Sequence, residues 1–447
     1  MRNGGFEVKT AVKTPSWLGV DLIRHRWLFP LMGALTTLIG GSSYAFSVFI
    51  RPLEAEFGWS RPETVAAFSV AMFALGAFMW ITGFFVDKYG PRIPFFIGAS
   101  LMVLSQILSS RVDTVTELII TYGLIGGTGI GMTYCASTIA TTTRWFPEPS
   151  KRGLTVGLSV AGFGMGSAFA SPIWTAAIAV YGWRFTYTMT GVVFAIALGI
   201  IGSILRFPPN DWEFVQGKGW QPRKDVKAGA SKTLPANKID FSFAQAIVTP
   251  QIWVTCFMFF TSIFGGLMAV SQLAAFATDK PPAGVGLTAA VAALAITVQA
   301  IFNGLGRPIW GYISSKIGTR TAYLLAIFTM IVAMLTLANA NSMPLLFLGA
   351  VLNGFAFGGT LGLNPILTTA FFGSSFIAAI YGFVFFLGFG FGGLFGPMAG
   401  AFIRDMTSTY QAAFYAAAGV ALLSFIVAAI FVPKAGQEKL PVPSKQK

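Results

Sequence analysis

The sequence predicts an all-α integral membrane protein with twelve transmembrane helices arranged as two six-helix repeats. The 447 residues are 55% hydrophobic and only 10% charged, whereas soluble domains contain about 25% charged residues. The mean hydropathy is +0.70, and runs of roughly 20 apolar residues, the length that crosses a ~30 Å hydrocarbon core, recur along the chain. A spacing of 228 residues relates motifs in the first half to motifs in the second.

Net charge and rare residue types exclude several functions. The net charge of +14 would fit a nucleic-acid partner, but the mean hydropathy excludes a basic soluble binder, so we expect no nucleic acid. Cys135 and Cys256 lie in apolar stretches, and the one histidine, His25, precedes the first apolar run. The sequence therefore predicts no disulfide framework, metal site, cofactor or His-based catalytic centre, and we expect a protein that is not an enzyme.

The apolar runs divide the chain into two bundles. A six-helix bundle over 27–206 follows a short N-terminal segment (1–26), and a second bundle over 249–432 precedes a tail (433–447). Residues 207–248 are polar, rich in lysine and proline, and predict a flexible linker. The expected spans are about 27–50, 63–86, 93–111, 116–142, 153–178, 184–206, 251–276, 285–314, 321–340, 344–369, 374–402 and 410–432.

Lysine and arginine predict the orientation. With both termini on one side, that side holds 23 of the 30 basic residues and the other side holds six, with Arg307 inside a span. Because basic loops stay in the cytoplasm, both termini and the linker are expected to be cytoplasmic. We expect a multi-pass protein of the cell membrane, specifically of a bacterial inner membrane. We also expect it to act as a monomer.

A glycine-rich motif repeats at the cytoplasmic ends of the second and eighth spans. The first copy contains Gly83, Asp87, Lys88 and Arg92; 228 residues later the second contains Gly311, Lys316 and Arg320, with Ser315 in place of the acid. Two parallel six-helix repeats joined by a cytoplasmic linker fit the major facilitator architecture, whose site lies between the halves. By analogy, the motif residues and Arg144 are expected to form a cytoplasmic gate; the alternative is a loop that only packs and orients.

A polar stripe on the eighth span carries the functional prediction. Gln299, Asn303 and Arg307 recur every four residues, so they share one helix face. Arg307 lies near mid-membrane, where an arginine costs at least ~2.5–3.5 kcal/mol and stays protonated. None of the sixteen acids lies at a span centre, so an incoming anion is the expected counter-charge. The alternative is a structural arginine satisfied by carbonyls, Asn303 and water.

Other interior residues are weaker candidates for the site. Tyr44, Tyr134 and Asn364 are polar groups within spans, and each is as readily a packing residue as a ligand contact. Phe357 and Phe385 could wall the site, although with 44 phenylalanines each is individually more typical of packing.

Several local strings resemble the oxalate/formate antiporter family of the major facilitator superfamily, and bacterial monocarboxylate carriers. They are residues 85–94, 144–147 with 151–153, 249–253 and 302–311, and the resemblance extends over about 27–432. It implies alternating-access transport of a small carboxylate, with Arg307 as the carboxylate-binding arginine and Tyr44 and Tyr134 as hydroxyl contacts. It also implies a departure: Gly388 stands where the oxalate-exchanging member has a second cation, Phe385 where it has a tryptophan, and Met72 where it has a glutamine.

One deep cation balances one carboxylate, so the sequence favours a monocarboxylate over a dianion. The expected mode is anion exchange, with proton symport as the alternative if the proton travels on the substrate, Asp87 or Glu117. An oxalate/formate-type dicarboxylate exchanger and a drug or metabolite exporter of the same fold are the alternative carriers. An exporter of cationic drugs would need a membrane-embedded acid, and an enzyme would need catalytic groups within the spans. A channel or a non-transporting sensor on this scaffold is a further alternative that the sequence does not exclude.

Overall fold

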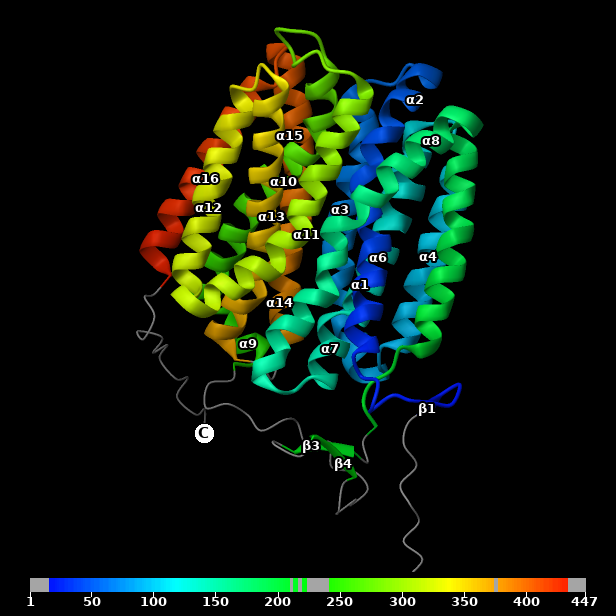
Figure 1. The fold of residues 1–447 in the computed structure, drawn as a ribbon, viewed down its shortest axis with the longest axis vertical. Helices are drawn as coiled ribbons and strands as arrows, with labels where there is room; N and C mark the ends of the chain where they lie inside the picture. The colour runs from blue at the N-terminus through cyan, green and yellow to red at the C-terminus, as the bar shows by residue number, and fades with distance from the viewer. Residues whose placement is uncertain (1–15, 210–211, 216–218, 223–240, 374–376, 433–447) are drawn as a thin grey trace, which may run out of the picture.

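The protein is a helical bundle (Figure 1). The computed structural model describes residues 16–209, 212–215, 219–222, 241–373 and 377–432. Within them, eleven helices are long and apolar enough to cross a membrane. One of these, α8 (Pro149–Ile204), turns at Gly182, whose φ of 80° lies in the left-handed region that glycine adopts without strain. α8 therefore supplies two crossings, and the described residues contain the twelve that the sequence predicts.

The N-terminal half contains the first six crossings, two of which are interrupted helices. The first crossing is α1 followed by a 3₁₀ turn and α2, and the fourth combines two short α-helices, a π-helical segment and a further helix. Their bounds are α1 Leu28–Gly41, η1 Ser42–Phe46, α2 Ser47–Phe57, α3 Arg61–Tyr89, α4 Arg92–Ser109, α5 Val115–Leu118, η2 Ile119–Gly126, α6 Gly127–Ser137, α7 Ile139–Trp145 and α8.

The C-terminal half repeats this plan. The eleventh crossing of the chain is divided by a π-helical segment, as the fourth is. Such segments often mark functional sites within helices. The elements of this half are α10 Pro250–Thr278, α11 Ala289–Ile317, α12 Thr319–Ala338, α13 Met343–Phe372, α14 Ile377–Phe385, η3 Phe386–Gly390, α15 Phe391–Thr407 and α16 Gln411–Phe431.

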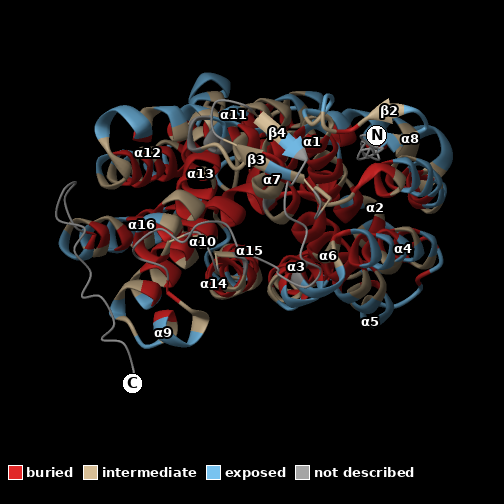
Figure 2. Ribbon diagram, turned by 90° about the horizontal axis from the view of Figure 1, so that it is seen from below, coloured by how far each residue is buried: buried red, intermediate tan, exposed pale blue. Residues whose placement is uncertain are grey.

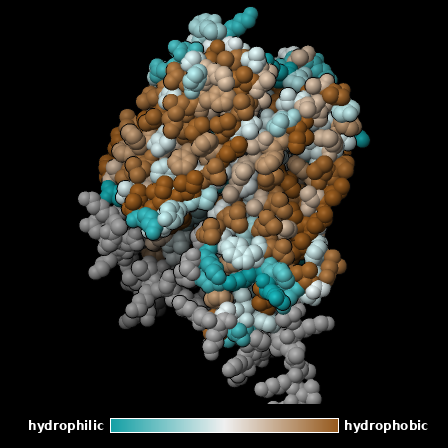
Figure 3. All heavy atoms as spheres, viewed as in Figure 1, coloured by the Kyte–Doolittle hydropathy of each residue, from teal (hydrophilic) through white to brown (hydrophobic). Residues whose placement is uncertain are grey.

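The surface has the character of a membrane protein. Seen along the bundle in Figure 2, buried residues lie on the inward helix faces and exposed residues lie around the perimeter. Many of the exposed residues are large and apolar, such as Val180, Ile196 and Ile430. On the face in Figure 3, hydrophobic residues dominate the middle and hydrophilic residues gather near the two ends. This pattern is that of a multi-pass membrane protein, whose perimeter faces lipid.

The two halves meet along two pairs of helices. Helix α11 packs against α8, and α3 packs against α14, η3 and α15. Glycines permit both contacts: a Cβ on Gly76 would lie 2.8 Å from the Cα of Gly390, and a Cβ on Gly164 would lie 2.3 Å from the side-chain oxygen of Asn303. Small residues let helix backbones approach closely in lipid, and here they bring α8 directly against the polar stripe of α11.

The segment between the halves differs from the expected flexible linker. Within its described residues, β3 (Trp212–Val215) and β4 (Gly219–Pro222) pair as an antiparallel hairpin, and α9 (Phe243–Ile247) precedes α10. Trp220 anchors the hairpin, because its indole N–H donates to the backbone oxygen of Trp145 at 3.3 Å. The lysine-rich composition that predicted flexibility comes largely from residues 223–240, which lie outside the described residues.

The hairpin marks one end of the bundle. A second two-stranded ribbon, β1 (Ser16–Trp17) with β2 (Val20–Asp21), lies at the same end, as does α9. The turn within α8 and the helix α2 lie at the opposite end (Figure 1). We call these the hairpin end and the far end.

Candidate substrate-binding site

Arg307 is buried between the two halves. Its side chain is 3% exposed, and it is the only buried lysine or arginine side chain among the residues that the structure describes. Nη1 donates to the backbone oxygen of Val160 in α8 at 2.6 Å, and Nη2 donates to Oδ1 of Asn303 at 3.3 Å. Nε is buried without a partner. The guanidinium thus has two neutral acceptors and an unused donor.

The stripe on α11 lies on one face, as the sequence predicts, and glycines press the neighbouring helices against it. Gly164 of α8 faces the Asn303 side chain, and Gly354 and Gly358 of α13 approach the backbone of Gln299 and Asn303. Gln299 and Asn303 are both buried, and the Nε2 of Gln299 has no partner. A buried amide without a partner costs about 1–3 kcal/mol, so this face of α11 has unused capacity for a polar ligand or water.

Aromatic residues from both halves enclose Arg307. Its guanidinium lies 5.9 Å from the ring centre of Phe163, whose ring makes edge contacts with Tyr44 and Tyr134 at 5.1 and 5.6 Å. Tyr44 also contacts Phe357 of the other half at 6.3 Å, and Tyr134 contacts Phe385 at 5.9 Å. The structure therefore brings together Arg307, Asn303, Tyr44, Tyr134, Phe357 and Phe385, all of which the sequence singled out.

The tyrosine hydroxyls add polar groups to this enclosure. Those of Tyr44 and Tyr134 both lie within electrostatic reach of Arg307. The hydroxyl of Tyr44 is buried without a partner. An arginine with a free donor, beside a free hydroxyl and an apolar wall, can bind a small molecule with one carboxylate and a short apolar body.

Asn364 belongs to a different cluster. Its Nδ2 lies 3.5 Å from the hydroxyl of Tyr323, and its Oδ1 lies 3.5 Å from the Oγ1 of Thr368. Both partners lie in the C-terminal half. The structure thus gives Asn364 a role in packing α12 against α13 and records no contact with Arg307.

Sequence reasoning missed three features of the enclosure. Phe163 and the carbonyl of Val160 come from α8, which the glycine pattern identified only as a packing helix. Tyr381 of α14 lies within electrostatic reach of Arg307 and contacts Phe385 at 5.9 Å. No local pattern distinguishes these residues from other apolar span residues; the crossing of α8 and α11 alone brings the first two to Arg307.

The arginines of the repeated motif cap helix ends. Arg92 donates to the backbone oxygens of Gly202 and Ser203, at the end of α8, at 3.4 and 3.3 Å. Arg320, 228 residues later, donates to the oxygen of Ala429 near the end of α16. A cation at a helix C-terminus satisfies free carbonyls and complements the helix dipole. The Arg92 contacts lie within the N-terminal half and the Arg320 contact lies within the C-terminal half. The structure therefore gives these residues a capping role in addition to the expected gating role.

The other expected gate residues lie near the hairpin end. Lys88 and Lys316 are exposed and lie over neighbouring tyrosine rings, and Arg144 lies 3.8 Å from the ring centre of Phe207. Gly83 is buried within α3; the side chain of Asp87 lies outside the described residues. Glu117, considered above as a proton carrier, caps the start of α5 by accepting from the backbone N–H of Asp113 and Thr114.

Comparison with known proteins identifies the class that this fold and site define. The chain belongs to the Major Facilitator Superfamily, whose family model matches residues 32–280 and 282–447, and it is a transporter rather than an enzyme. It is 29% identical to the oxalate:formate antiporter of Oxalobacter formigenes over 93% of this chain and 94% of that protein. It is also 26% identical to human monocarboxylate transporter 14, covering 85% and 84% of the two chains. Identity to the hexuronate transporter of Bacillus subtilis is 25%, covering 87% and 90%.

Proposed function

We propose that this protein carries a small monocarboxylate across the membrane by alternating access, with Arg307 binding the carboxylate. The observation that carries the proposal is the buried guanidinium with neutral partners and a free Nε, at the contact between the halves. Among the described residues no recorded ion pair includes Arg307. A carboxylate supplies the missing counter-charge, and arginine presents a planar fork that matches it.

The surroundings of Arg307 favour a single carboxylate. Gly388, where the resemblance places a second cation in the oxalate-exchanging member, lies in η3 and is packed so tightly that a Cβ there would lie 2.5 Å from the ring of Phe259. Phe259 also contacts Phe385 at 5.8 Å. The position is therefore occupied by apolar packing, and a second carboxylate would enter a low-dielectric region without compensation.

The bond between Arg307 and Val160 suggests how binding and movement are coupled. Any movement that separates α11 from α8 at this level breaks the bond and leaves a buried Nη1 without an acceptor. A bound carboxylate replaces the lost acceptor and uses the free Nε. Substrate therefore lowers the cost of separating the halves, and this favours exchange of one anion for another over movement of the empty carrier.

The orientation is part of the same proposal. By the sequence count, the loops assigned to the side of the hairpin hold 23 of the 30 basic residues, so that side is proposed to face the cytoplasm together with both termini. The far end then faces the side of a bacterial inner membrane opposite the cytoplasm. The carrier acts as a monomer, because each chain contains both halves of the site.

Two measurements on the purified protein test the proposal. A thermal-shift screen against formate, acetate, lactate, oxalate and malonate should show stabilisation by a monocarboxylate and less by the dianions. Proteoliposomes loaded with the unlabelled ligand should then accumulate the labelled one by counterflow, which a channel or a sensor does not produce. Stabilisation by oxalate above all monocarboxylates would favour the dicarboxylate exchanger, and stabilisation by none of the acids would contradict the carboxylate site.

A further inference from the structure

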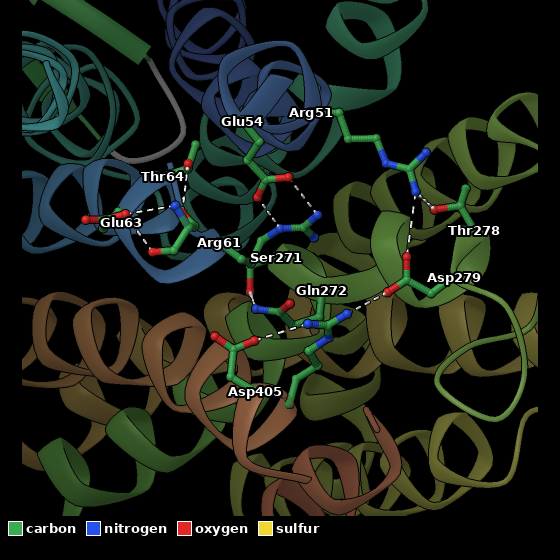
Figure 4. Close-up of polar contacts among 12 residues, drawn as sticks. Arg51, Glu54, Arg61, Glu63, Thr64, Ser271, Gln272, Thr278, Asp279 and Asp405 are labelled. Atoms are coloured by element: carbon green, nitrogen blue, oxygen red, sulfur yellow. Dashed lines mark hydrogen bonds and ion pairs between the residues drawn. The ribbon is translucent and has the colours of Figure 1, made fainter. Parts of the chain in front are cut away.

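Charged residues at the far end link the two halves. Figure 4 shows Arg51 of α2, in the N-terminal half, beside Asp279, which directly follows α10 in the C-terminal half. The Nη2 of Arg51 lies 3.7 Å from Oδ1 of Asp279 and donates to Oγ1 of Thr278 at 2.7 Å. The neighbouring pair Arg61–Glu54, at 2.6 Å, joins two residues of the N-terminal half, and Arg61 also lies within electrostatic reach of Asp279.

Asp279 is held in place by its own half. Its Oδ2 accepts from Nη2 of Arg404 at 3.4 Å and from the hydroxyl of Tyr410 at 3.2 Å. A carboxylate at the C-terminal end of a helix interacts unfavourably with the helix dipole. Asp279 therefore does not stabilise α10. These contacts instead fix Asp279 where the guanidinium of Arg51 arrives from the other half.

We propose that Asp279 and Arg51 form the latch that closes the far end of the carrier, and that this latch must separate before a carboxylate reaches Arg307 from that end. The inference rests on the proposed alternating-access function. The side chain of Arg51 is 58% exposed, and exposed ion pairs are weak. A weak pair suits a contact that must open and close in every cycle.

The space behind the latch leads toward the site. A cavity of about 10 Å³, roughly the space that one water molecule needs, lies between the halves and is lined by Ser47 and Ser271 among apolar residues. Tyr44 also lines this cavity and lies within electrostatic reach of Arg307. The hydroxyl of Ser47 is buried without a partner. Separation of α2 from α10 would therefore widen a small, mostly apolar cavity that is lined by Tyr44 of the enclosure around Arg307.

Cysteine labelling tests the latch without a substrate. In full-length protein with Cys135→Ala and Cys256→Ala, a reporter is introduced as Ser271→Cys and its rate of reaction with a membrane-impermeant maleimide is measured. Arg51→Gln and Asp279→Asn should each raise this rate about two- to fivefold, the range that an exposed ion pair supports. Arg51→Lys, which keeps the charge, should raise it less.

Two controls separate a latch from general loosening. Arg184→Gln removes the ion pairs with Glu56 and Asp113, which lie at the same end but within the N-terminal half, and it should leave the rate at position 271 unchanged. A reporter at Thr255→Cys, towards the hairpin end of the same helix, should not become more reactive in Arg51→Gln. Unchanged labelling at position 271 in both latch variants, or an equal rise in Arg184→Gln, would overturn the inference. Because no substrate is needed, a labelling change in a protein that binds no carboxylate would retain the latch and reject the carboxylate function.

Discussion

Arg307 of α11 donates a 2.6 Å hydrogen bond to the backbone oxygen of Val160 in α8, so the buried cation of the C-terminal half is tied to the N-terminal half. The acceptor is a main-chain carbonyl and carries no charge to balance the guanidinium. The sequence left two interpretations of Arg307, a ligand site and a structural arginine satisfied by carbonyls and Asn303. The structure shows both partners of the structural interpretation, a backbone carbonyl and Asn303. The Nε has no partner, and a purely structural role leaves this donor unexplained.

The first prediction concerns Arg307 itself. Arg307→Lys keeps the charge but loses the planar fork, so it should weaken carboxylate binding roughly 10- to 100-fold, the loss expected for charged hydrogen bonds worth about 1.5–3 kcal/mol. The measurement is the ligand concentration that half-saturates the thermal shift. Arg184→Lys, which alters a partly exposed arginine paired with Asp113 at the far end, should bind as the parent does. Full ligand affinity in Arg307→Ala would exclude Arg307 from the site.

The second prediction concerns charge selectivity. Gly388→Lys alone should fold poorly, because its Cβ would lie 2.5 Å from the ring of Phe259. Gly388→Lys with Phe259→Ala gives the side chain room and should shift preference toward dianions such as oxalate. The ratio of oxalate to formate affinity measures the shift, with Phe259→Ala alone as the control. A ratio that stays at the control value in a folded double variant would show that position 388 does not face the ligand.

The third prediction concerns the crossing of α8 and α11. A Cβ on Gly164 would lie 2.3 Å from Oδ1 of Asn303 and 2.6 Å from the backbone nitrogen of Gly304, and overpacking of this kind typically costs about 1–3 kcal/mol. Gly164→Ala should therefore lower the Tm and the ligand affinity together. Gly157→Ala on the same helix meets nothing within 4 Å and should keep or raise the Tm, since alanine favours helix. Equal Tm changes in the two variants would contradict the close-contact argument.

Periodicity and composition predicted most of the fold because they report on the membrane itself. Apolar length identified the twelve crossings, including the pair that meets at Gly182, and the spacing of Gln299, Asn303 and Arg307 placed three polar groups on one buried face. The 228-residue shift that relates Arg92 to Arg320 reappears as two equivalent helix caps. These features depend on residues close together in the sequence or on the internal repeat. Both kinds of pattern can be read directly from the amino-acid sequence.

Features that depend on the contact between the halves were not predictable in this way. Phe163 and Val160 reach Arg307 because α8 crosses α11 at Gly164, and Asn364 turns instead to Tyr323 within its own half. The hairpin formed by β3 and β4 was also missed. Its strands are four residues long and are held partly by Trp220 against Trp145, a tertiary contact.

The fourth prediction separates capping from gating in the repeated motif. Arg320→Ala removes a cation from the end of α16 and should destabilise the protein by about 0.3–2 kcal/mol, with a lower Tm and unchanged ligand affinity. Lys316→Ala, in the exposed last turn of α11 and over the ring of Tyr312, should lower the Tm less, because an exposed cation interacts only weakly with the helix dipole. Arg92→Ala and Lys88→Ala provide the same comparison in the first half. A transport defect in Arg320→Ala without a change in Tm would favour gating over capping.

The last prediction concerns coupling. Arginine side chains keep their charge in proteins, and when α11 separates from α8 the guanidinium of the empty site loses the Val160 acceptor. An unloaded carrier should therefore change conformation slowly in both directions. Proteoliposomes loaded with unlabelled carboxylate should therefore take up labelled carboxylate much faster than empty ones, with little effect of a pH gradient. Vesicles that contain the Arg307→Ala variant control for leakage and should show no such difference. Rapid accumulation into empty vesicles, driven by an inward proton gradient alone, would instead indicate symport, with the proton carried on the substrate, and would leave Arg307 as the binding residue.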